Sequence, residues 1–229
     1  MQIVCVLIAA LLAVVRCEKT EREAAFAARQ LLDSTIHAEL SSIVKSSEKP
    51  NANGYVYGSL EYIAPDCTSN NGDVLLYLAD MSMEGGNVQA DSSHVSLTIR
   101  DLTYYNDSRD RKPGVMDRAR LSLMGEVSVV PDELVRICFS LEWQGHKRLF
   151  PELQLPQVER CFFTVHPDAK YWKYAHVFRF WLLKPRDIYW VGGFGSRHYI
   201  GWIGIDLYRS ETSETKLVNQ PRRRRSSSK

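Results

Sequence analysis

The chain has 229 residues, of which 45% are hydrophobic and 24% are charged. This balance is typical of a folded protein and excludes wholesale disorder, and the length suits one good-sized domain or two small ones. The formal net charge of +2 is unevenly distributed, because Arg222 to Arg225 and Lys229 crowd the C-terminus and leave 24 basic against 27 acidic residues elsewhere. A mildly acidic body argues against nucleic acid as the main partner.

The N-terminus has the features of a secretory signal peptide. Residues 3–15 form an apolar run as long as the core of a signal peptide and too short to span a bilayer comfortably. Val15 and Cys17 suit the positions before a cleavage site, so we assign residues 1–17 to the signal peptide. No positive charge precedes the run, and a membrane-anchored N-terminus is the alternative. The sequence thus predicts a secretory route to an extracellular or endolysosomal destination, with no transmembrane anchor after cleavage.

The pattern after the signal predicts one helix followed by a series of strands. Apolar residues at helical spacing predict a helix over 20–44, within a lead-in segment that extends over 18–53. Alternating and apolar segments predict strands over 55–64, 73–79, 95–102, 119–130, 177–184 and 187–191. Gly125 indicates a bulge or bend in the fourth strand, and Pro185 predicts a turn between the last two. Shorter helical segments are expected within 81–90, 132–143 and 156–165.

Six strands with interspersed helices predict a mainly β, α+β fold. The expected architecture is a small β-barrel over 54–210, with the N-terminal helix and helical insertions. The polar composition of 211–229 predicts a disordered basic tail. Its Arg222–Arg225 run resembles a nuclear signal, which a secretory protein does not readily use. Cleavage at the basic residues, binding to anionic glycans and no function at all are the other interpretations.

Three cysteines remain after the signal peptide, namely Cys67, Cys138 and Cys161. They allow one internal bridge, and we predict Cys138–Cys161 because both lie in neighbouring helical patterns; buried free thiols are the alternative. The absence of a CxxC motif and of Cys/His ligand spacing predicts no metal site. Asn106 begins the one N-x-S/T sequon, in a polar loop, and is predicted to carry a glycan.

Several short strings, taken in order, resemble the CREG family. This family belongs to the wider group of FMN-binding split barrels, which includes pyridoxamine-phosphate oxidases and HugZ-type haem oxygenases. The strings are ARQLL from Ala28, the strand 73–79 with a helix ending at Asn87, HVSLTI from His94, ARLSLMG from Ala119, HPDAKYW from His166 and WVGGFG from Trp190. Each string alone is weak, but six in the right order are specific. The resemblance implies a six-stranded FMN-binding split β-barrel that pairs with a second copy as a homodimer.

In flavin-binding relatives, the FMN phosphate is held by basic and hydroxyl groups near the second strand and the following helix, because charge-assisted bonds offset its desolvation. In the matching run of this chain, Glu84 and Gly85 stand where HugZ-like relatives carry His and Thr. The resemblance leaves Ser82 and Asn87 as cofactor-binding candidates. Arg120 on the fourth strand is the nearby basic candidate, and a rim or ion-pair role is its alternative. Glu84 would repel a phosphate.

These observations predict a secreted or endolysosomal glycoprotein with a degenerate flavin pocket. It would act without catalytic residues or a cofactor, as a binding or signalling protein with an unknown protein partner or receptor. An FMN-dependent oxidoreductase is the alternative function. A haem-binding or haem-degrading protein is the third function considered. HugZ-type enzymes ligate haem with a histidine in a C-terminal tail, and in this chain no histidine follows His198, so the resemblance does not support that activity.

Overall fold

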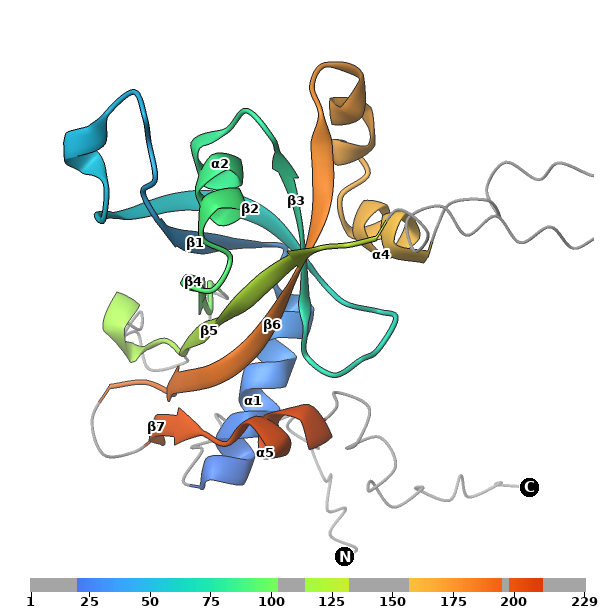
Figure 1. Cartoon of the computed structure of the whole chain (residues 1–229). Helices are drawn as coiled ribbons and strands as arrows, with labels where there is room; N and C mark the ends of the chain where they lie inside the picture. The colour runs from blue at the N-terminus through green and yellow to red at the C-terminus, as the bar shows by residue number, and fades with distance from the viewer. Residues whose placement is uncertain (1–19, 103–113, 132–156, 195–197, 212–229) are drawn as a thin grey trace, which may run out of the picture.

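The computed structural model describes residues 20–102, 114–131, 157–194 and 198–211 (Figure 1). The predicted signal peptide, the Asn106 sequon, Cys138, the helix expected over 132–143 and the tail beyond Glu211 lie outside these residues.

Seven antiparallel strands form one sheet in the order β3-β2-β1-β4-β5-β6-β7, and β3 also pairs with β6. The first six strands therefore close into a barrel, and β7 extends the sheet beyond the closure (Figure 1). The strands are β1 His37–Ile43, β2 Val56–Pro65, β3 Val74–Ala79, β4 Val95–Arg100, β5 Arg120–Val129, β6 Phe178–Val191 and β7 Ile200–Ile203. The predicted six-stranded split barrel is confirmed, with β7 as an addition that the sequence did not reveal.

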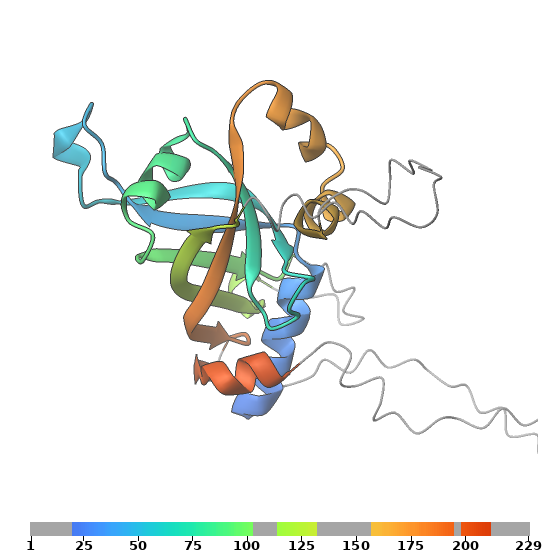
Figure 2. The ribbon, with the colours of Figure 1, turned by 45° about the vertical axis from the view of Figure 1, so that its right-hand side comes forward.

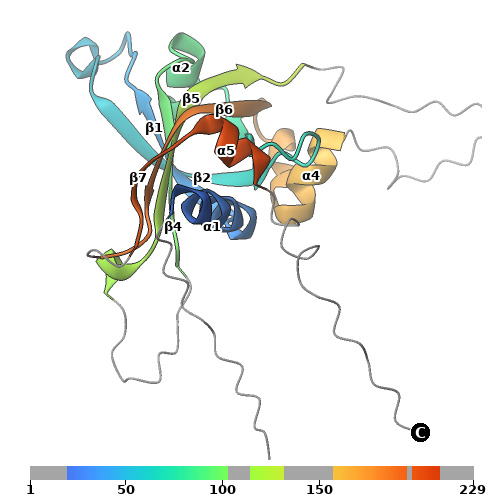
Figure 3. The same ribbon diagram turned by 90° about the horizontal axis from the view of Figure 1, so that it is seen from below.

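Short helices surround the barrel. The α-helices are α1 Glu21–Ser34, α2 Met83–Ala90, α4 Gln157–Val165 and α5 Ile205–Ser210, and the 3₁₀-helices are η1 Pro50–Ala52, η2 Val115–Asp117 and η4 Ala169–Tyr174. Figure 3 shows α1 and α5 close to β7, whereas α4 lies at the side of the barrel. Among the described residues, we find no helix with both the length and the apolar character that a membrane span requires.

Helix α1 begins at a capping box, in which the Thr20 hydroxyl accepts from the backbone N–H of Glu23 and the Glu23 carboxylate accepts from the backbone N–H of Thr20. The helix ends at Ser34, so the predicted helix over 20–44 is wrong for its second half. Residues 37–43 form β1 instead, with alternate side chains buried in the barrel. β1 is thus a barrel strand within the segment that we expected to be the lead-in.

Strand β5, the fourth of the strands predicted from the sequence, contains the predicted bulge. Its pairing with β6 shifts register between Met124 and Gly125, so that Asp187 faces Met124 and Pro185 faces Gly125. Proline cannot donate to a sheet ladder, and a bulge is one of the few places where a strand accepts it. The predicted turn at Pro185 is therefore wrong, because β6 continues through it as one strand of 14 residues.

Two hydrophobic clusters stabilise the fold. The larger fills the barrel and includes the α1 residues Ala24, Ala25, Ala28 and Leu32. The second lies outside the barrel, where Phe162 and Phe163 of α4 pack against Tyr77 of β3 and Phe180 of β6. Figure 2 shows α4 beside the barrel. The rings of this second cluster surround Tyr77: the ring of Phe180 stacks on it with centroids 4.5 Å apart, and the ring of Phe163 meets it edge to face.

A disulfide joins α4 to the loop between β2 and β3. It connects Cys161 with Cys67, whose Cα atoms lie 5.9 Å apart. The prediction of a Cys138–Cys161 bridge is therefore wrong. Proximity of the two cysteines depends on the packing of α4 against the barrel, which neighbouring helical patterns in the sequence do not reveal.

Candidate functional site at the split mouth

The barrel parts between β2 and β3 at one end. These strands pair only from Ile63 opposite Leu76 to Pro65 opposite Val74. Before Ile63, β2 pairs with β1 alone, and after Leu76, β3 pairs with β6. Helix α2 lies at this opening (Figure 1). We call the opening the split mouth, defined by residues 57–61 of β2 and 82–87 at the start of α2.

Ser82 caps helix α2. Its hydroxyl accepts from the backbone N–H of Gly85 at 3.1 Å and donates to the carbonyl oxygen of Ala79 at 2.9 Å. A serine at this position typically stabilises a helix by about 1 kcal/mol. The Ser82 side chain thus already makes the contacts that form the turn into α2.

Asn87 is buried and joins α2 to the end of β1. Its side-chain amide donates to the Ser42 hydroxyl at 3.1 Å, and its carbonyl oxygen accepts from the backbone N–H of Lys45 at 3.1 Å. With only 1% of its surface exposed, Asn87 presents little to a ligand. Both polar groups of the Asn87 side chain therefore already make hydrogen bonds that hold α2 to the end of β1.

Arg120 does not reach the split mouth. It pairs with Val191 at the last residue of β6, whereas the mouth lies near Phe178, the first residue of β6, which pairs with Ala79. The guanidinium of Arg120 contacts the sulfur of Met116 at 3.0 Å. The structure therefore brings Ser82 and Asn87 together on α2 and places Arg120 at the opposite end of the barrel.

Glu61 is the residue that the sequence analysis missed. It lies on the face of β2 that carries Ile63 into the core, and burial raises the pKa of its carboxyl to about 7. The Ser59 hydroxyl opposes this rise, although it makes no hydrogen bond of normal geometry within the described residues, and the carboxylate of Glu84 adds to it. The alternation of β2 could have revealed a carboxylate on the inward face.

Glu84 completes an acidic lining. It stands in the first turn of α2, where a negative charge complements the positive end of the helix dipole. Burial raises the pKa of the nearby Tyr57 phenol, and the charges of Glu84 and Glu61 raise it further. Two carboxyl groups and a phenol from two separate elements therefore share the mouth.

Gly85 allows α2 to start close against β3. A side-chain Cβ at this position would collide with the carbonyl oxygen of Ala79, a backbone atom. The turn therefore leaves no room for the threonine that HugZ-like relatives carry at the matching position. Restoring that residue would require the backbone of the turn to move.

These residues do not fit the phosphate of a flavin. A phosphate needs donors and positive charge, but Glu61 and Glu84 offer carboxyl groups. The donors that remain, at Ser82 and Asn87, already bond to the protein. No group of three or more potential metal ligands occurs among the described residues either.

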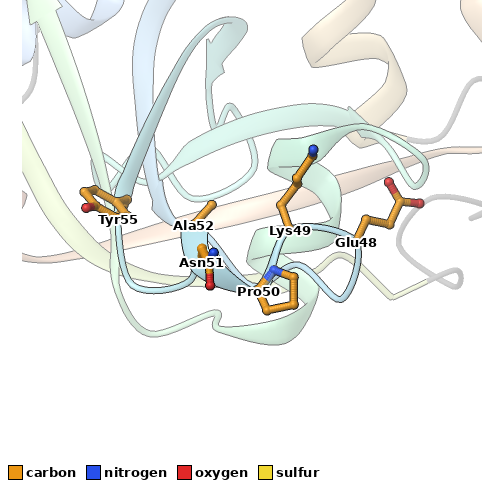
Figure 4. Close-up of a pocket in the computed structure, with 6 residues that line it drawn as sticks. All are labelled: Glu48, Lys49, Pro50, Asn51, Ala52 and Tyr55. Atoms are coloured by element: carbon orange, nitrogen blue, oxygen red, sulfur yellow. The ribbon is translucent and has the colours of Figure 1, made fainter.

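Two surface hollows lie elsewhere. The first is lined by Glu48, Lys49, Pro50, Asn51, Ala52 and Tyr55, and Figure 4 shows that its residues come from one loop. The second is lined by residues of β1, β4, β5 and β6, and at its rim Arg186 pairs with Glu126 at 2.6 Å and His94 with Asp91 at 2.9 Å. Neither hollow brings unpaired charged groups from separate elements together as the split mouth does.

Known structures share this fold. A haem-binding protein from Mycobacterium smegmatis matches with a TM-score of 0.56 and 20% identity, over 83% of this chain and 61% of that one. ChuZ from Campylobacter jejuni matches with a TM-score of 0.52 and 13% identity, over 83% of this chain and 66% of that one. This chain thus spans about two thirds of the length of both. A protein of the pyridoxinephosphate oxidase family from Clostridium acetobutylicum has a TM-score of 0.47 and 10% identity, over 82% and 98% of the two chains.

The closed barrel and its parted β2–β3 edge define a split β-barrel, and the mycobacterial and Campylobacter structures share this fold. A search of curated protein sequences found no match. The family model of the CREG β-barrel matches residues 19–210, and the chain therefore belongs to the CREG family. The family assignment that the six sequence strings suggested is confirmed.

Proposed function

We propose that this chain is a secreted or endolysosomal glycoprotein with a degenerate flavin pocket, which acts as a non-catalytic binding or signalling protein. The observation that carries the proposal is the acidic lining of the split mouth, where Glu84 stands at the position of a histidine in HugZ-like relatives and Glu61 adds a second carboxyl group. The closed turn at Gly85 supports it, because a larger side chain does not fit there.

The disulfide supports the secretory part of this proposal. Bridges such as Cys67–Cys161 persist in oxidising compartments and are rare in the cytosol. A signal peptide over residues 1–17 and a glycan on Asn106 would complete a secreted glycoprotein. Action as a homodimer on a protein partner or receptor belongs to the same proposal.

An FMN-dependent oxidoreductase is the alternative function, since the wider class contains flavin enzymes. A haem-binding protein is the second alternative, because the mycobacterial neighbour with this fold is described as haem-binding. His166 is not available as a ligand for either group. It is 2% exposed, its Nε2 donates to the carbonyl oxygen of Ile63 at 2.8 Å, and its ring stacks on Tyr62.

An absorbance spectrum of protein purified from a secretory host separates these functions. We expect neither a flavin band nor a Soret band, and no change in FMN fluorescence when the protein is added to FMN. A yellow protein, or saturable FMN binding, would overturn the non-catalytic proposal in favour of a flavoprotein. A Soret band on haem titration would instead favour a haem-binding protein.

The route through the secretory pathway is tested separately. When cells express the full chain, we expect it in the medium or in endolysosomes, with Glu18 as the N-terminal residue. Substitution Asn106→Gln is expected to remove one glycan from the protein, visible as a faster-migrating band. Recovery of a cytosolic protein that retains residues 1–17 would contradict the secretory assignment without bearing on the mouth.

A further inference from the structure

The 3₁₀-helix η4 sorts its side chains onto separate faces. In a 3₁₀-helix, residues i and i+3 lie one above the other. Ala169 and Trp172 form the inward pair. Ala169 is fully buried, and the Trp172 ring packs 5.1 Å from Tyr62 and 6.4 Å from Tyr77 between ring centroids.

The remaining positions form a basic pair and an aromatic pair on the surface. Lys170 and Lys173 share one face, and Tyr171 and Tyr174 share the other. The two tyrosines are 67% and 79% exposed. Each therefore presents a large amphipathic ring to solvent, beside a lysine.

Two further apolar side chains lie close to this segment. Val177 follows η4 and is 65% exposed. Its carbonyl oxygen accepts from the backbone N–H of Asp80 at 2.9 Å, so the turn that carries the 73% exposed Met81 lies beside it. Figures 1 and 2 show that η4 projects from the end of the barrel at which α2 lies. We call this surface the η4 tip, defined by Met81, Lys170, Tyr171, Lys173, Tyr174 and Val177.

Contacts on the buried side of η4 attach the tip to the barrel. Asp168 accepts from the Tyr62 hydroxyl at 3.2 Å immediately before η4. The Cys67–Cys161 bridge fixes α4, the preceding helix, to the barrel. The exposed rings are therefore presented by an ordered segment, and a partner can bind them with little loss of backbone entropy.

The charges of the tip remain largely available. The ammonium of Lys173 lies 3.9 Å from the Glu159 carboxylate, at the limit of an ion pair. The neighbouring Asp80 is neutralised by Arg179 at 2.8 Å. Residues 169–177 contain no acidic side chain, and the carboxylate of Asp168, directly before them, accepts from the Tyr62 hydroxyl. The tip thus combines positive charge with exposed aromatic and aliphatic groups.

We propose that the η4 tip docks the protein peripherally on an anionic membrane surface. Tyrosine rings are favoured at the boundary between headgroups and acyl chains, because one end is apolar and the other polar. Val177 and Met81 would enter that boundary, and the lysines would contact the phosphates of acidic lipids. This surface adjoins the mouth at Met81 but does not include its carboxyl groups, and the proposal stands whether or not the mouth binds a cofactor.

Vesicle co-sedimentation of the full chain tests the proposal. The probes are phosphatidylcholine vesicles with and without roughly 30% phosphatidylserine, a content that gives a negative surface potential. Because Arg222–Arg225 also attract anionic lipid, every variant is compared in a background with these four arginines changed to Ala. In that background we expect binding only to the phosphatidylserine vesicles, weakening as salt is added.

Two double variants separate the contributions of the tip. Lys170→Gln with Lys173→Gln is expected to weaken binding on the order of tenfold, and most strongly at low salt. Tyr171→Ser with Tyr174→Ser is expected to weaken it at every salt concentration, because apolar insertion is little screened. The control is Lys49→Gln with Tyr55→Ser, which removes an exposed lysine and a tyrosine that is 70% exposed from the loop in Figure 4.

Equal binding to both vesicle types would overturn the proposal, as would equal loss of binding in the control. Retention on heparin that depends on Lys170 and Lys173, without vesicle binding, would assign the tip to a sulfated glycan and exclude the membrane. Since these side chains are exposed, all variants should keep the wild-type melting temperature, which confirms that each is folded.

Discussion

Cys161 on α4 is bonded to Cys67 in the β2–β3 loop, across 94 residues of sequence. A bridge over so long a segment restricts the unfolded chain strongly, and this effect corresponds to about 3 to 5 kcal/mol of stability. We therefore expect Cys67→Ser and Cys161→Ser each to lower the free energy of unfolding by about that amount. Urea unfolding measures the loss.

Cys138→Ser is the matched control for the disulfide. It removes the partner that the sequence pattern suggested, and we expect it to leave stability and the bridge unchanged. Peptide mapping without reduction should show Cys67 joined to Cys161 in this variant. A map that joins Cys138 to Cys161 in the wild type would contradict the observed connectivity.

The buried carboxyl of Glu61 makes stability depend on pH. Because burial raises its pKa from 4.5 to about 7, the folded protein holds the proton more tightly than the unfolded chain does. Its contribution is therefore complete below pH 4.5 and is lost as the pH rises through 7. Since the side chain is only partly buried, we expect about 1 to 2 kcal/mol between these limits.

Glu61→Gln removes this dependence. The variant should be more stable than wild type at pH 8, and its stability should change less between pH 5 and pH 8, as measured by urea unfolding. Glu48→Gln, in the exposed loop of Figure 4, should follow the wild-type curve. A wild-type curve that rises between pH 5 and pH 7 while Glu61→Gln stays flat would refute the raised pKa.

Arg29 connects α1, α5 and the β2–β3 loop from a buried position. Its guanidinium donates to the backbone carbonyl and side-chain oxygens of Asn70 at 3.0 and 3.2 Å and to the carbonyl of Tyr208 at 3.4 Å. Arg29→Met should lower the free energy of unfolding by about 3 kcal/mol, because the buried carbonyl of Tyr208 and the part-buried contacts to Asn70 lose their donor. Arg186→Met, whose side chain is 66% exposed and pairs with the 44% exposed Glu126, should cost less than about 1 kcal/mol. Equal losses would contradict this account.

Gly125 and Gly86 give a matched pair of glycine substitutions. A Cβ at Gly125 would collide with the backbone carbonyl of Lys184 across the bulge, whereas a Cβ at Gly86 meets nothing within 4 Å. Gly125→Ala should therefore destabilise the protein by about 2 to 3 kcal/mol. Gly86→Ala, within α2, should stabilise it by about 0.5 to 1 kcal/mol. Thermal unfolding decides between these signs, and a neutral Gly125→Ala would contradict the tight bulge.

The strands could be predicted from the sequence where apolar and polar residues alternate clearly. The prediction failed where the spacing of apolar residues fits both a helix and a strand. In residues 37–43, single apolar side chains stand between small or polar ones, and the spacing of Leu40 and Ile43 fits a helix as well as a strand. No glycine or proline marks the end of α1 at Ser34. Tertiary pairing of β1 with β2 and β4 decides the outcome there, and a local pattern does not contain that information.

The candidate site was also predictable only where local sequence order determines the position of a residue. Ser82 and Asn87 follow β3 closely, so their place on α2 could be inferred from short-range order. Arg120 could not be placed, because its distance from the mouth depends on the register of β5 against β6. Glu61 has no motif around it, and its importance appears only when the strand face is combined with the charge of Glu84.

Strand β6 pairs with β3, β5 and β7, and its pairing with β3 closes the barrel sheet. β3 ends at Ala79, and its partner strand β6 begins only at Phe178. During synthesis, the β3 edge therefore stays open until the ribosome has made nearly the whole barrel. Long-range closure of this kind slows folding and exposes an edge that other chains can join. A nascent chain of this protein would need protection by chaperones up to its last strands.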